Sequence, residues 1–443
     1  MTYDFEMAEA VSNQLCEMLP RLTEQEAVVE SNRCLYCFDA PCTHACPTHI
    51  DVPKFIKKIA TGNLIGSATA ILDANLLGAT CARVCPVQEL CEGACVLGAE
   101  HRPIMIGRLQ RHAMDYVADR ELDVVATGSP TGKSVAVIGA GPAGLSCAGE
   151  LARAGHKVIL LEKRPLPGGL STYGIITLRE PTEVALAEVE MIKRLGVTVV
   201  PGTEFGKEVT LKSLQAEHDA VFFGVGLGST PEMSIEGEEY VLDGLEYIEA
   251  SKINPGKLEV GRAVLVIGAG NTAIDCATVA KRLGAESVTM IYRRSEHEMS
   301  AYAHEYEFIK GEGVAFRFLT QPVRVLTDTS SVIGLECVRM ALGEPDSTGR
   351  PAPQPVPGSE FVVEAEQIVK AIGQDPPAIA GLLGLEREKG YIKVSQDFET
   401  SLPGVYAGGD CIRAIGAAST VMAVQDGKLA ARAIHRHLME GMS

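Results

Sequence analysis

The feature that most constrains this chain is a strand-like run that passes directly into a glycine-rich turn. The apolar residues 135–138 lead into G-x-G-x-x-G at 139–144, and a helical pattern follows at 145–154. A second apolar run, 158–161, ends in Glu162. A strand, a glycine-rich turn, a helix, a second strand and an acidic residue, in this order, form the unit that binds an ADP-bearing dinucleotide.

The glycines of this motif have separate tasks. Gly139 permits the tight turn, Gly141 lets the backbone approach the pyrophosphate, and Gly144 lets helix and strand pack closely. The pyrophosphate lies at the helix N-terminus, and Glu162 accepts hydrogen bonds from a ribose. An acid here favours an unphosphorylated adenosine ribose, as in FAD. The motif residues are Gly139, Ala140, Gly141, Pro142, Ala143 and Gly144.

A second copy of the pattern lies further along the chain. Residues 262–273 combine a strand-like run with G-x-G-x-x-A, and a helix is predicted at 273–283. The next strand, 287–292, ends in Arg293 and Arg294 instead of an acid. Two guanidinium groups at this place suit a 2′-phosphate and favour NADPH; the alternative is a solvated arginine pair at a strand end. The motif residues are Gly268, Gly270, Asn271 and Thr272.

Cysteines are concentrated near the N-terminus: eight of 13 lie between residues 34 and 95. They form C-x2-C-x4-C-x3-C-P and then C-x3-C-P-x4-C-x3-C. The first pattern is close to the bacterial ferredoxin run, with two extra residues before the third cysteine. Eight thiolates suit two [4Fe–4S] clusters; structural zinc and simple core packing are the alternatives.

The C-terminal region supplies further candidate flavin contacts. The stretch 400–410 places Asp410, after Gly409, at a strand end, where its carboxylate can bind a ribityl hydroxyl. A helix opens near Thr420 and Val421. Its positive end would favour reduction of a flavin, because the reduced isoalloxazine carries negative charge.

Composition limits the compartment and the partners. The net charge of −17 argues against a nucleic-acid groove or an anionic membrane surface as partner. No apolar run approaches the ~20 residues of a membrane span, and the acidic residues 1–6 do not resemble a signal peptide. We therefore expect a cytoplasmic protein whose clustered cysteines bind metal and do not form disulfides.

A chain of 443 residues needs more than one hydrophobic core. Residues 1 to about 30 look helical, and 320–365 look like a β-meander. We predict an α/β protein with two nested Rossmann-like dinucleotide-binding folds preceded by an α-helical iron–sulfur domain. The predicted segments are 1–125 (helical, two [4Fe–4S] clusters), 126–232 (FAD-binding, first part), 233–370 (NAD(P)-binding) and 371–443 (FAD-binding, second part).

With these motifs the chain resembles pyridine-nucleotide-linked flavoproteins with an N-terminal iron–sulfur module, the group of glutamate synthase small subunits and dihydropyrimidine dehydrogenases. The resemblance extends over roughly residues 25–440. Residues 39–42, 46–51 and 103–110 look most like dihydropyrimidine dehydrogenase, in particular the flavoprotein subunit of the bacterial two-subunit enzyme.

The resemblance implies four ligands for each cluster. One set would be Cys34, Cys37, Cys42 and Cys95, and the other Cys46, Cys85, Cys91 and Gln110. Gln110 would be an unusual ligand, and Cys81 would be spare.

The resemblance also implies which residues contact the nucleotides. The flavin contacts would include Glu162, Lys163, Gly169, Leu170, Arg179, Gly409, Asp410, Thr420 and Val421. The NAD(P) contacts would include Gly270, Asn271, Thr272, Arg293, Arg294, Ala371 and Gly373. Ser300 stands where the NADPH-dependent relative has another arginine, which leaves NADH and NADPH both open. Residues 176–179 replace a Pro-aromatic stretch, so the wall over the flavin is expected to differ.

In function, the resemblance implies an electron-input subunit. NAD(P)H, the substrate, would reduce FAD, and electrons would pass singly through both clusters to a partner subunit that contains FMN and iron–sulfur centres. That partner would reduce uracil or thymine, in a heterodimer or heterotetramer. No catalytic acid or base is expected, because the cofactors carry the chemistry. The alternatives are a glutamate synthase small subunit, a ferredoxin:NAD(P) transhydrogenase subunit and a non-enzymatic redox-sensing or scaffold subunit.

Overall fold

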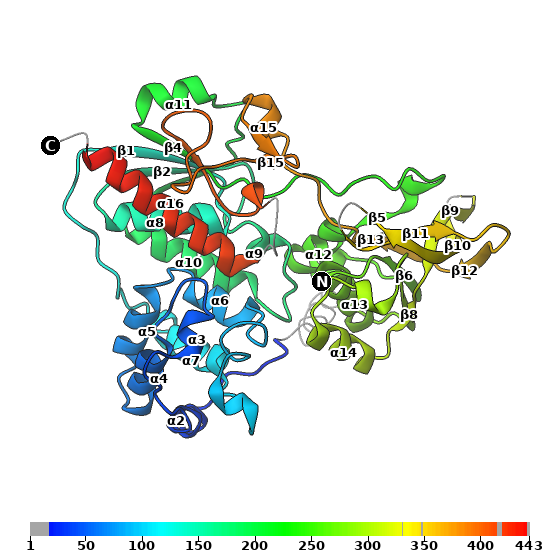
Figure 1. Cartoon of the computed structure of the whole chain (residues 1–443), viewed down its shortest axis with the longest axis horizontal. Coiled ribbons are helices and arrows are strands. Elements are labelled where there is room, and N and C mark those ends of the chain that lie inside the picture. The colour runs from blue at the N-terminus through cyan, green and yellow to red at the C-terminus, as the bar shows by residue number, and fades with distance from the viewer. Residues whose placement is uncertain (1–16, 330, 347–348, 414–418, 441–443) are drawn as a thin grey trace, which may run out of the picture. The chain divides into compact units, whose positions relative to one another are not determined.

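The computed structural model describes residues 17–329, 331–346, 349–413 and 419–440 (Figure 1). The first half of the predicted N-terminal helical segment, residues 1–16, lies outside them. The chain forms two compact units. The inserted unit is built mainly from Ser229–Asp375 and includes Tyr173–Leu178; the main unit contains Met18–Thr172, Arg179–Gly228 and the chain from Pro376 onward.

The main unit is built on a parallel sheet whose strands, apart from the edge strand β3, are mostly buried and rich in apolar residues. Its order is β16-β4-β1-β2-β3. The strands are β1 (Ser134–Ile138), β2 (Lys157–Glu162), β3 (Thr198–Pro201), β4 (Ala220–Phe223) and β16 (Val405–Ala407). Because β16 follows the inserted unit and pairs in parallel with β4, the chain leaves this sheet and later returns to it.

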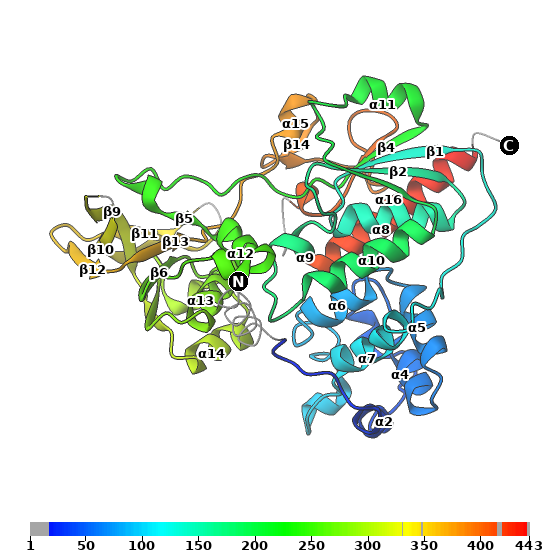
Figure 2. The same cartoon turned by 180° about the vertical axis from the view of Figure 1, so that it is seen from behind.

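Helices cover both faces of this sheet (Figures 1 and 2). One apolar core joins the sheet to α8 (Pro142–Arg153), α10 (Thr182–Arg194) and α16 (Thr420–Glu440). A second core joins the opposite face to α11 (Leu211–Glu217) and α15 (Ile379–Leu382). The smaller elements are α9 (Leu170–Tyr173), η5 (Asp410–Ile412) and the hairpin of β14 (Arg387–Glu388) and β15 (Tyr391–Ile392).

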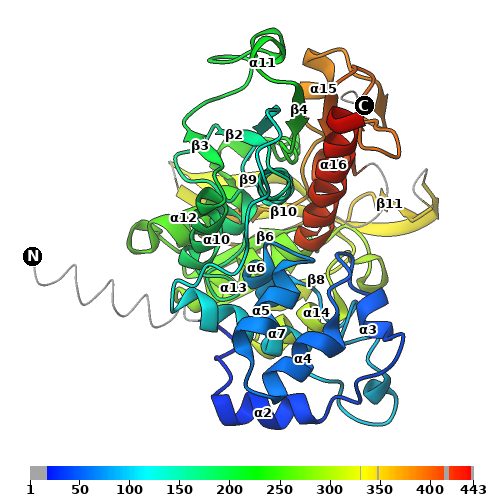
Figure 3. The same cartoon turned by 90° about the vertical axis from the view of Figure 1, so that its left-hand side faces the viewer.

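The N-terminal part of the main unit is a small helical module (Figure 3). Its elements are α2 (Glu24–Asn32), α3 (Pro41–His44), α4 (Val52–Ala60), α5 (Leu64–Leu72), α6 (Gly78–Val84), η1 (Val96–Ala99) and α7 (Ile106–Ala118). Side-chain caps start α2, α4 and α5, from Thr23, Asp51 and Asn63. Phe55 and Ile56 on α4 and Leu109 on α7 are fully buried and form the centre of the module's core.

The inserted unit contains a second parallel sheet, in the order β5-β13-β6-β7-β8. The strands are β5 (Leu242–Asp243), β6 (Ala263–Ile267), β7 (Ser287–Ile291), β8 (Ala315–Arg317) and β13 (Gln367–Lys370). Its helical elements are η2 (Glu238–Tyr240), α12 (Gly244–Ile253), η3 (Pro255–Lys257), α13 (Asn271–Arg282), η4 (Glu296–Glu298) and α14 (Ala303–Gly311). An antiparallel sheet lies where the β-meander was predicted, with β9 (Thr320–Asp328), β10 (Ser331–Pro345), β11 (Pro351–Pro355) and β12 (Phe361–Glu364).

The predicted fold class is therefore confirmed: two nested dinucleotide-binding folds follow a helical module. The four predicted segment boundaries stay a prediction. Among the described residues, no helix is long and apolar enough to cross a membrane.

Helix α16 lies against α8, the helix that follows the first glycine motif (Figure 1). The approach is closest at Gly427, where an added Cβ would lie 2.1 Å from the carbonyl oxygen of Ala143. The Ser146 hydroxyl also donates to the carbonyl of Val424 at 2.7 Å. A side chain at position 427 would therefore separate the two helices.

Gly427→Ala is expected to destabilise the protein by about 1–3 kcal/mol, because the helices cannot separate without disturbing a packed core. Thermal unfolding monitored by circular dichroism should show a lower melting temperature. The matched control is Gly311→Ala at the end of α14, where a Cβ meets nothing within 4 Å. That variant should keep or slightly exceed the wild-type stability. A wild-type melting temperature for Gly427→Ala would contradict the close approach.

Candidate flavin, nucleotide and iron–sulfur sites

The turn after β1 is shaped by glycines in close backbone contact. Gly139 has a φ of +93°, and a Cβ on Gly144 would lie 1.9 Å from the carbonyl oxygen of Gly139. A Cβ on Gly169 would lie 2.7 Å from the Cα of Gly141, so the loop after β2 passes directly over the turn. The amide of Gly168 donates to the carbonyl of Ala140 at 2.8 Å and fixes this approach. The turn at 139–144 and the glycines 168–169 therefore form a cradle of backbone atoms that a ligand can approach closely.

Helix α8 starts at this cradle without a side-chain cap. Gly141 is its N-cap and Pro142, which has no N–H, is its first residue. The free amides of the first turn and the helix dipole suit a pyrophosphate. Glu162, buried at the end of β2, accepts from the amides of Ala140 and Arg164, both at 2.8 Å. This carboxylate is held at the position that contacts a ribose, and the cradle therefore fits an ADP moiety.

The C-terminal candidates meet the same cradle. Gly409 has a φ of +82°, and a Cβ there would lie 2.8 Å from that of Ala143. The Asp426 carboxylate accepts from the amide of Gly409 at 3.2 Å and pairs with Arg413. Asp410 is the first residue of η5, and burial raises the pKa of its carboxyl, with the Asp426 charge raising it further. Asp426 was not predicted from the sequence, because an acid inside an amphipathic helix normally faces solvent.

The other predicted flavin residues are placed differently. Lys163 is exposed on the loop after β2, Leu170 is exposed at the start of α9, and Arg179 is partly buried. Thr420 is the first residue of α16, and the adjoining Val421 is buried in the core that α16 shares with α8. The roles of these five residues stay predictions.

The inserted unit repeats the glycine geometry. Gly268 has a φ of +136°, and a Cβ there would lie 2.2 Å from the carbonyl oxygen of Ala371. The amide of Ala371 donates to the carbonyl of Ile267 at 2.8 Å, which fixes the end of β13 beside the motif. Gly270 is the N-cap of α13, again without a side-chain cap, and the Asn271 side chain accepts from the amide of Tyr302 at 3.1 Å. Thr272 lies on α13 and Gly373 follows β13, and their roles in binding a nucleotide stay predictions.

The two predicted 2′-phosphate ligands have different surroundings. Arg294 is buried; its guanidinium donates to Asp346 at 2.6 Å and to the carbonyl of Pro351 at 2.9 Å. It therefore attaches the antiparallel sheet to the end of β7. Arg293 is exposed and stands at the strand end, where a nucleotide ribose is recognised. Exposed Ser300 lies near the motif, its hydroxyl 3.2 Å from the Cβ position of Gly270.

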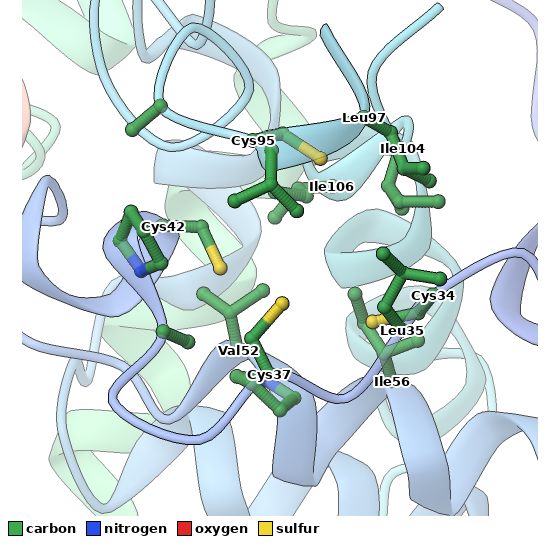
Figure 4. A pocket seen from close by; sticks show the side chains of 15 residues that line it. Cys34, Leu35, Cys37, Cys42, Val52, Ile56, Cys95, Leu97, Ile104 and Ile106 are labelled. Carbon is green, nitrogen blue, oxygen red and sulfur yellow. The ribbon is translucent and has the colours of Figure 1, made fainter. Parts of the chain in front are cut away.

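In the helical module, one set of thiols lines a pocket together with apolar side chains (Figure 4). Cys34, Cys37, Cys42 and Cys95 approach it from two segments that are far apart in sequence. Val52, Ile56, Ile104 and Ile106 supply apolar walls. Burial and the neighbouring thiols of Cys34 and Cys95 raise the pKa of Cys42 to about 11. In such surroundings thiolates need a cationic partner, which a cluster supplies.

The second set of thiols lies deeper in the module. Hydrogen bonding with Cys81 raises the pKa of the Cys85 thiol well above its ordinary value, and burial and the nearby Cys91 and Cys46 raise it further. Cys81 is therefore beside the set from which the resemblance excluded it. The Gln110 amide is also buried, but its nitrogen donates to the carbonyl of Gly78 at 2.7 Å.

The spacing of the thiols bears on the zinc alternative. Zinc needs four ligands about 2.0–2.3 Å from a single point. Among the described residues, no three Cys, His, Asp or Glu side chains converge closely enough to hold one metal ion. A cubane distributes its thiolates over several irons and accepts wider spacing. Four thiols that line one apolar pocket suit a [4Fe–4S] cluster, which is held by four thiolates.

The remaining described cysteines, Cys147, Cys276, Cys337 and Cys411, are each buried. They lie on α8, α13, β10 and η5, and burial is the largest cause raising the pKa of each thiol. Buried thiols of this kind behave as small apolar side chains.

Comparison with known proteins agrees with this geometry. Residues 133–427 match the family described as pyridine nucleotide-disulphide oxidoreductase, and residues 11–122 match dihydropyrimidine dehydrogenase domain II, 4Fe-4S cluster. The chain belongs to the pyridine nucleotide-disulphide oxidoreductase family.

Three relatives show the range of these proteins. The beta subunit of NADP(+)-dependent formate dehydrogenase from Moorella thermoacetica is 38% identical over 91% of this chain, which spans only 60% of that protein. The NAD-dependent dihydropyrimidine dehydrogenase subunit PreT of Escherichia coli K12 is 35% identical over 97% of this chain and 98% of its own length. The small chain of glutamate synthase [NADPH] from the same strain is 34% identical over 95% and 93%.

Solved structures share the fold. Mycobacterium tuberculosis FprA in complex with NADPH is 18% identical, with a TM-score of 0.59 over 71% of this chain and 85% of its own. Lactococcus lactis thioredoxin reductase is 23% identical, with a TM-score of 0.54 over 70% and 99%. This chain therefore binds FAD, NAD(P)H and [4Fe–4S] clusters. It is an NAD(P)H-dependent flavin and iron–sulfur electron-transfer subunit.

Arg293→Ala is expected to raise the KM for NADPH about tenfold and to change the KM for NADH little, because only NADPH presents a 2′-phosphate to the exposed guanidinium. Steady-state reduction of an artificial acceptor by each nucleotide would measure both constants. Arg294→Ala is the comparison: it should lower the melting temperature, because it removes the Asp346 pair, and should not discriminate between the nucleotides. Equal losses for NADH and NADPH in Arg293→Ala would contradict this role.

Cys81 and Gln110 are the two candidates for the fourth ligand of the second cluster. Because Cys81 lies beside Cys85, the Cys81→Ala variant is expected to lose one cluster. The Gln110→Leu variant should keep both clusters. Iron and sulfide analysis with electron paramagnetic resonance of the dithionite-reduced protein would count the clusters. Loss of a cluster in Gln110→Leu, with both retained in Cys81→Ala, would instead establish the glutamine as the ligand.

Proposed function

We propose that this chain is the NAD(P)H-oxidising subunit of a two-subunit dihydropyrimidine dehydrogenase. The observation that supports this best is the end-to-end match with the PreT subunit, which covers 97% of one chain and 98% of the other. The family model that matches residues 11–122 is also described as a dihydropyrimidine dehydrogenase domain. The second candidate is a glutamate synthase small subunit, favoured by a match of 95% and 93% of the two chains.

The main unit would couple two-electron and one-electron chemistry. Bound FAD accepts a hydride, and [4Fe–4S] clusters accept electrons one at a time. The chain positions both kinds of site in one compact unit: Gly141 and Glu162 hold the dinucleotide end, and α16 connects the flavin region to the module. Its residues provide orientation and fixed charge, and no acid or base.

The partner would dock beside the first set of thiols. Leu35, Phe38 and Val96 are exposed apolar side chains, and Phe38 is fully exposed. Each of them directly follows one of the cysteines of the first set: Cys34, Cys37 and Cys95, respectively. Aromatic and aliphatic side chains at the centre of an interface contribute most of its binding energy. We infer that the FMN-containing subunit covers this apolar rim, which brings its own redox centre close to the cluster.

The test compares two electron acceptors. Alone, the chain should oxidise NAD(P)H with an artificial acceptor and leave uracil unreduced. With the companion subunit from the native host, uracil reduction should appear, and Phe38→Ser should lower it at least about tenfold without changing dye reduction. Val29→Ser, which alters another exposed apolar residue of the module, is the matched control. Uracil turnover by the chain alone would refute the proposal.

The companion also distinguishes the second candidate. Co-purification with a large amidotransferase chain, together with glutamate formation and no uracil reduction, would assign the protein to glutamate synthase.

A further inference from the structure

A lysine is buried where the flavin-binding fold meets the iron–sulfur module. Lys428 of α16 is only 4% exposed. Its ammonium donates to the carbonyl oxygens of Thr48 and Ala74, both at 2.8 Å. Both acceptors belong to the module, so the charge of a flavin-fold helix lies among the residues that support the clusters.

One of these acceptors leads directly to a cluster thiol. The hydroxyl of Thr48 lies 3.3 Å from the sulfur of Cys46, and both residues are buried. Thr48 therefore accepts from Lys428 with its carbonyl and faces Cys46 with its hydroxyl. The ammonium is separated from this predicted cluster ligand by a single residue.

The other charges near Lys428 come from three places. Arg432 is on the same helix, Glu150 and Arg153 are on α8, and Cys46 is in the module. Glu150 and Arg153 pair with each other at 3.3 Å. Burial, followed by the Arg432 charge, lowers the pKa of Lys428 to about 8.

A buried ammonium bonded to two neutral carbonyls is costly unless an anion lies near it. A thiolate-ligated cluster is such an anion, and it gains a further negative charge on reduction. A fixed positive charge stabilises the reduced form more than the oxidised form, because attraction grows with the charge of the cluster.

We propose that Lys428 raises the reduction potential of the cluster bound by Cys46 and its neighbours, and so shifts the electron equilibrium from the reduced flavin toward that cluster. The inference rests on the flavin-to-cluster electron transfer of this family, whichever partner receives the electrons. Lys428 acts through its charge and makes no contact with substrate.

Lys428→Gln tests this, because the amide keeps a donor for the carbonyls and removes the charge. Anaerobic redox titration, followed by electron paramagnetic resonance for the clusters and by absorbance for the flavin, would give each midpoint potential. The potential of one cluster should fall by an amount equivalent to about tenfold in the electron equilibrium, or 59 mV for one electron. The other cluster and the flavin should change much less. Lys428→Arg, which keeps the charge, should stay near the wild-type potential.

A second variant covers the case in which Lys428→Gln loses its clusters. Glu150→Gln removes a carboxylate whose charge acts on Lys428. Titrated well below the pKa of Lys428, where the lysine keeps its charge without Glu150, the same potential should rise. Unchanged cluster potentials in Lys428→Gln, a larger change in the flavin than in the cluster, or equal shifts in the Gln and Arg variants would overturn the proposal. A fall in potential in Glu150→Gln would also overturn it. The melting temperature of each variant reports any purely structural effect separately.

Discussion

The main unit depends on the contact between α16 and α8 at Gly427, where the backbones approach too closely for any side chain. Three consecutive residues of α16 meet three different parts of the unit there. Asp426 accepts a hydrogen bond from the amide of Gly409, just before η5, and Gly427 packs on Ala143 of the glycine motif. Lys428 donates to carbonyl oxygens of the iron–sulfur module. A shift of α16 would therefore disturb the flavin cradle and the module together.

The same backbone geometry is used twice, for two nucleotides. In each parallel sheet a positive-φ glycine follows the strand of the glycine motif, β1 or β6, and lies close to the end of a neighbouring strand: Gly139 beside Gly224, and Gly268 beside Ala371. In each case an uncapped helix follows, at Pro142 and at Asn271. We predict that the charged residue at or after the end of the next strand, Glu162 or Arg293, distinguishes the nucleotides, because this position meets the 2′ end of the ribose in such folds.

Local patterns in the sequence were enough to predict both parallel sheets, both glycine turns and the helical module, because each depends on short spacings. The division of the cysteines into two ligand sets came from the resemblance to a known family, and it stays a prediction. Contacts between distant residues were not predictable in this way. Arg294 looked like a nucleotide ligand but binds Asp346, 52 residues away. Cys81 looked spare, yet it lies beside Cys85. Asp426 was missed altogether, because its partner, Gly409, is brought to it only by the fold.

The flavin fold holds the cluster-binding segment through its backbone. Lys428 bonds to the carbonyl of Ala74, and Arg153 to that of Leu72 at 3.3 Å. Glu188 of α10 accepts from the amides of Ala79 and Thr80, at 2.6 and 3.3 Å. Leu72 and Ala74 precede α6, and Ala79 and Thr80 lie in its first turn. Helix α6 carries Cys81 and ends just before Cys85. Main-chain bonds fix the path of the chain, so the flavin-binding fold directly positions the segment that leads to Cys81 and Cys85.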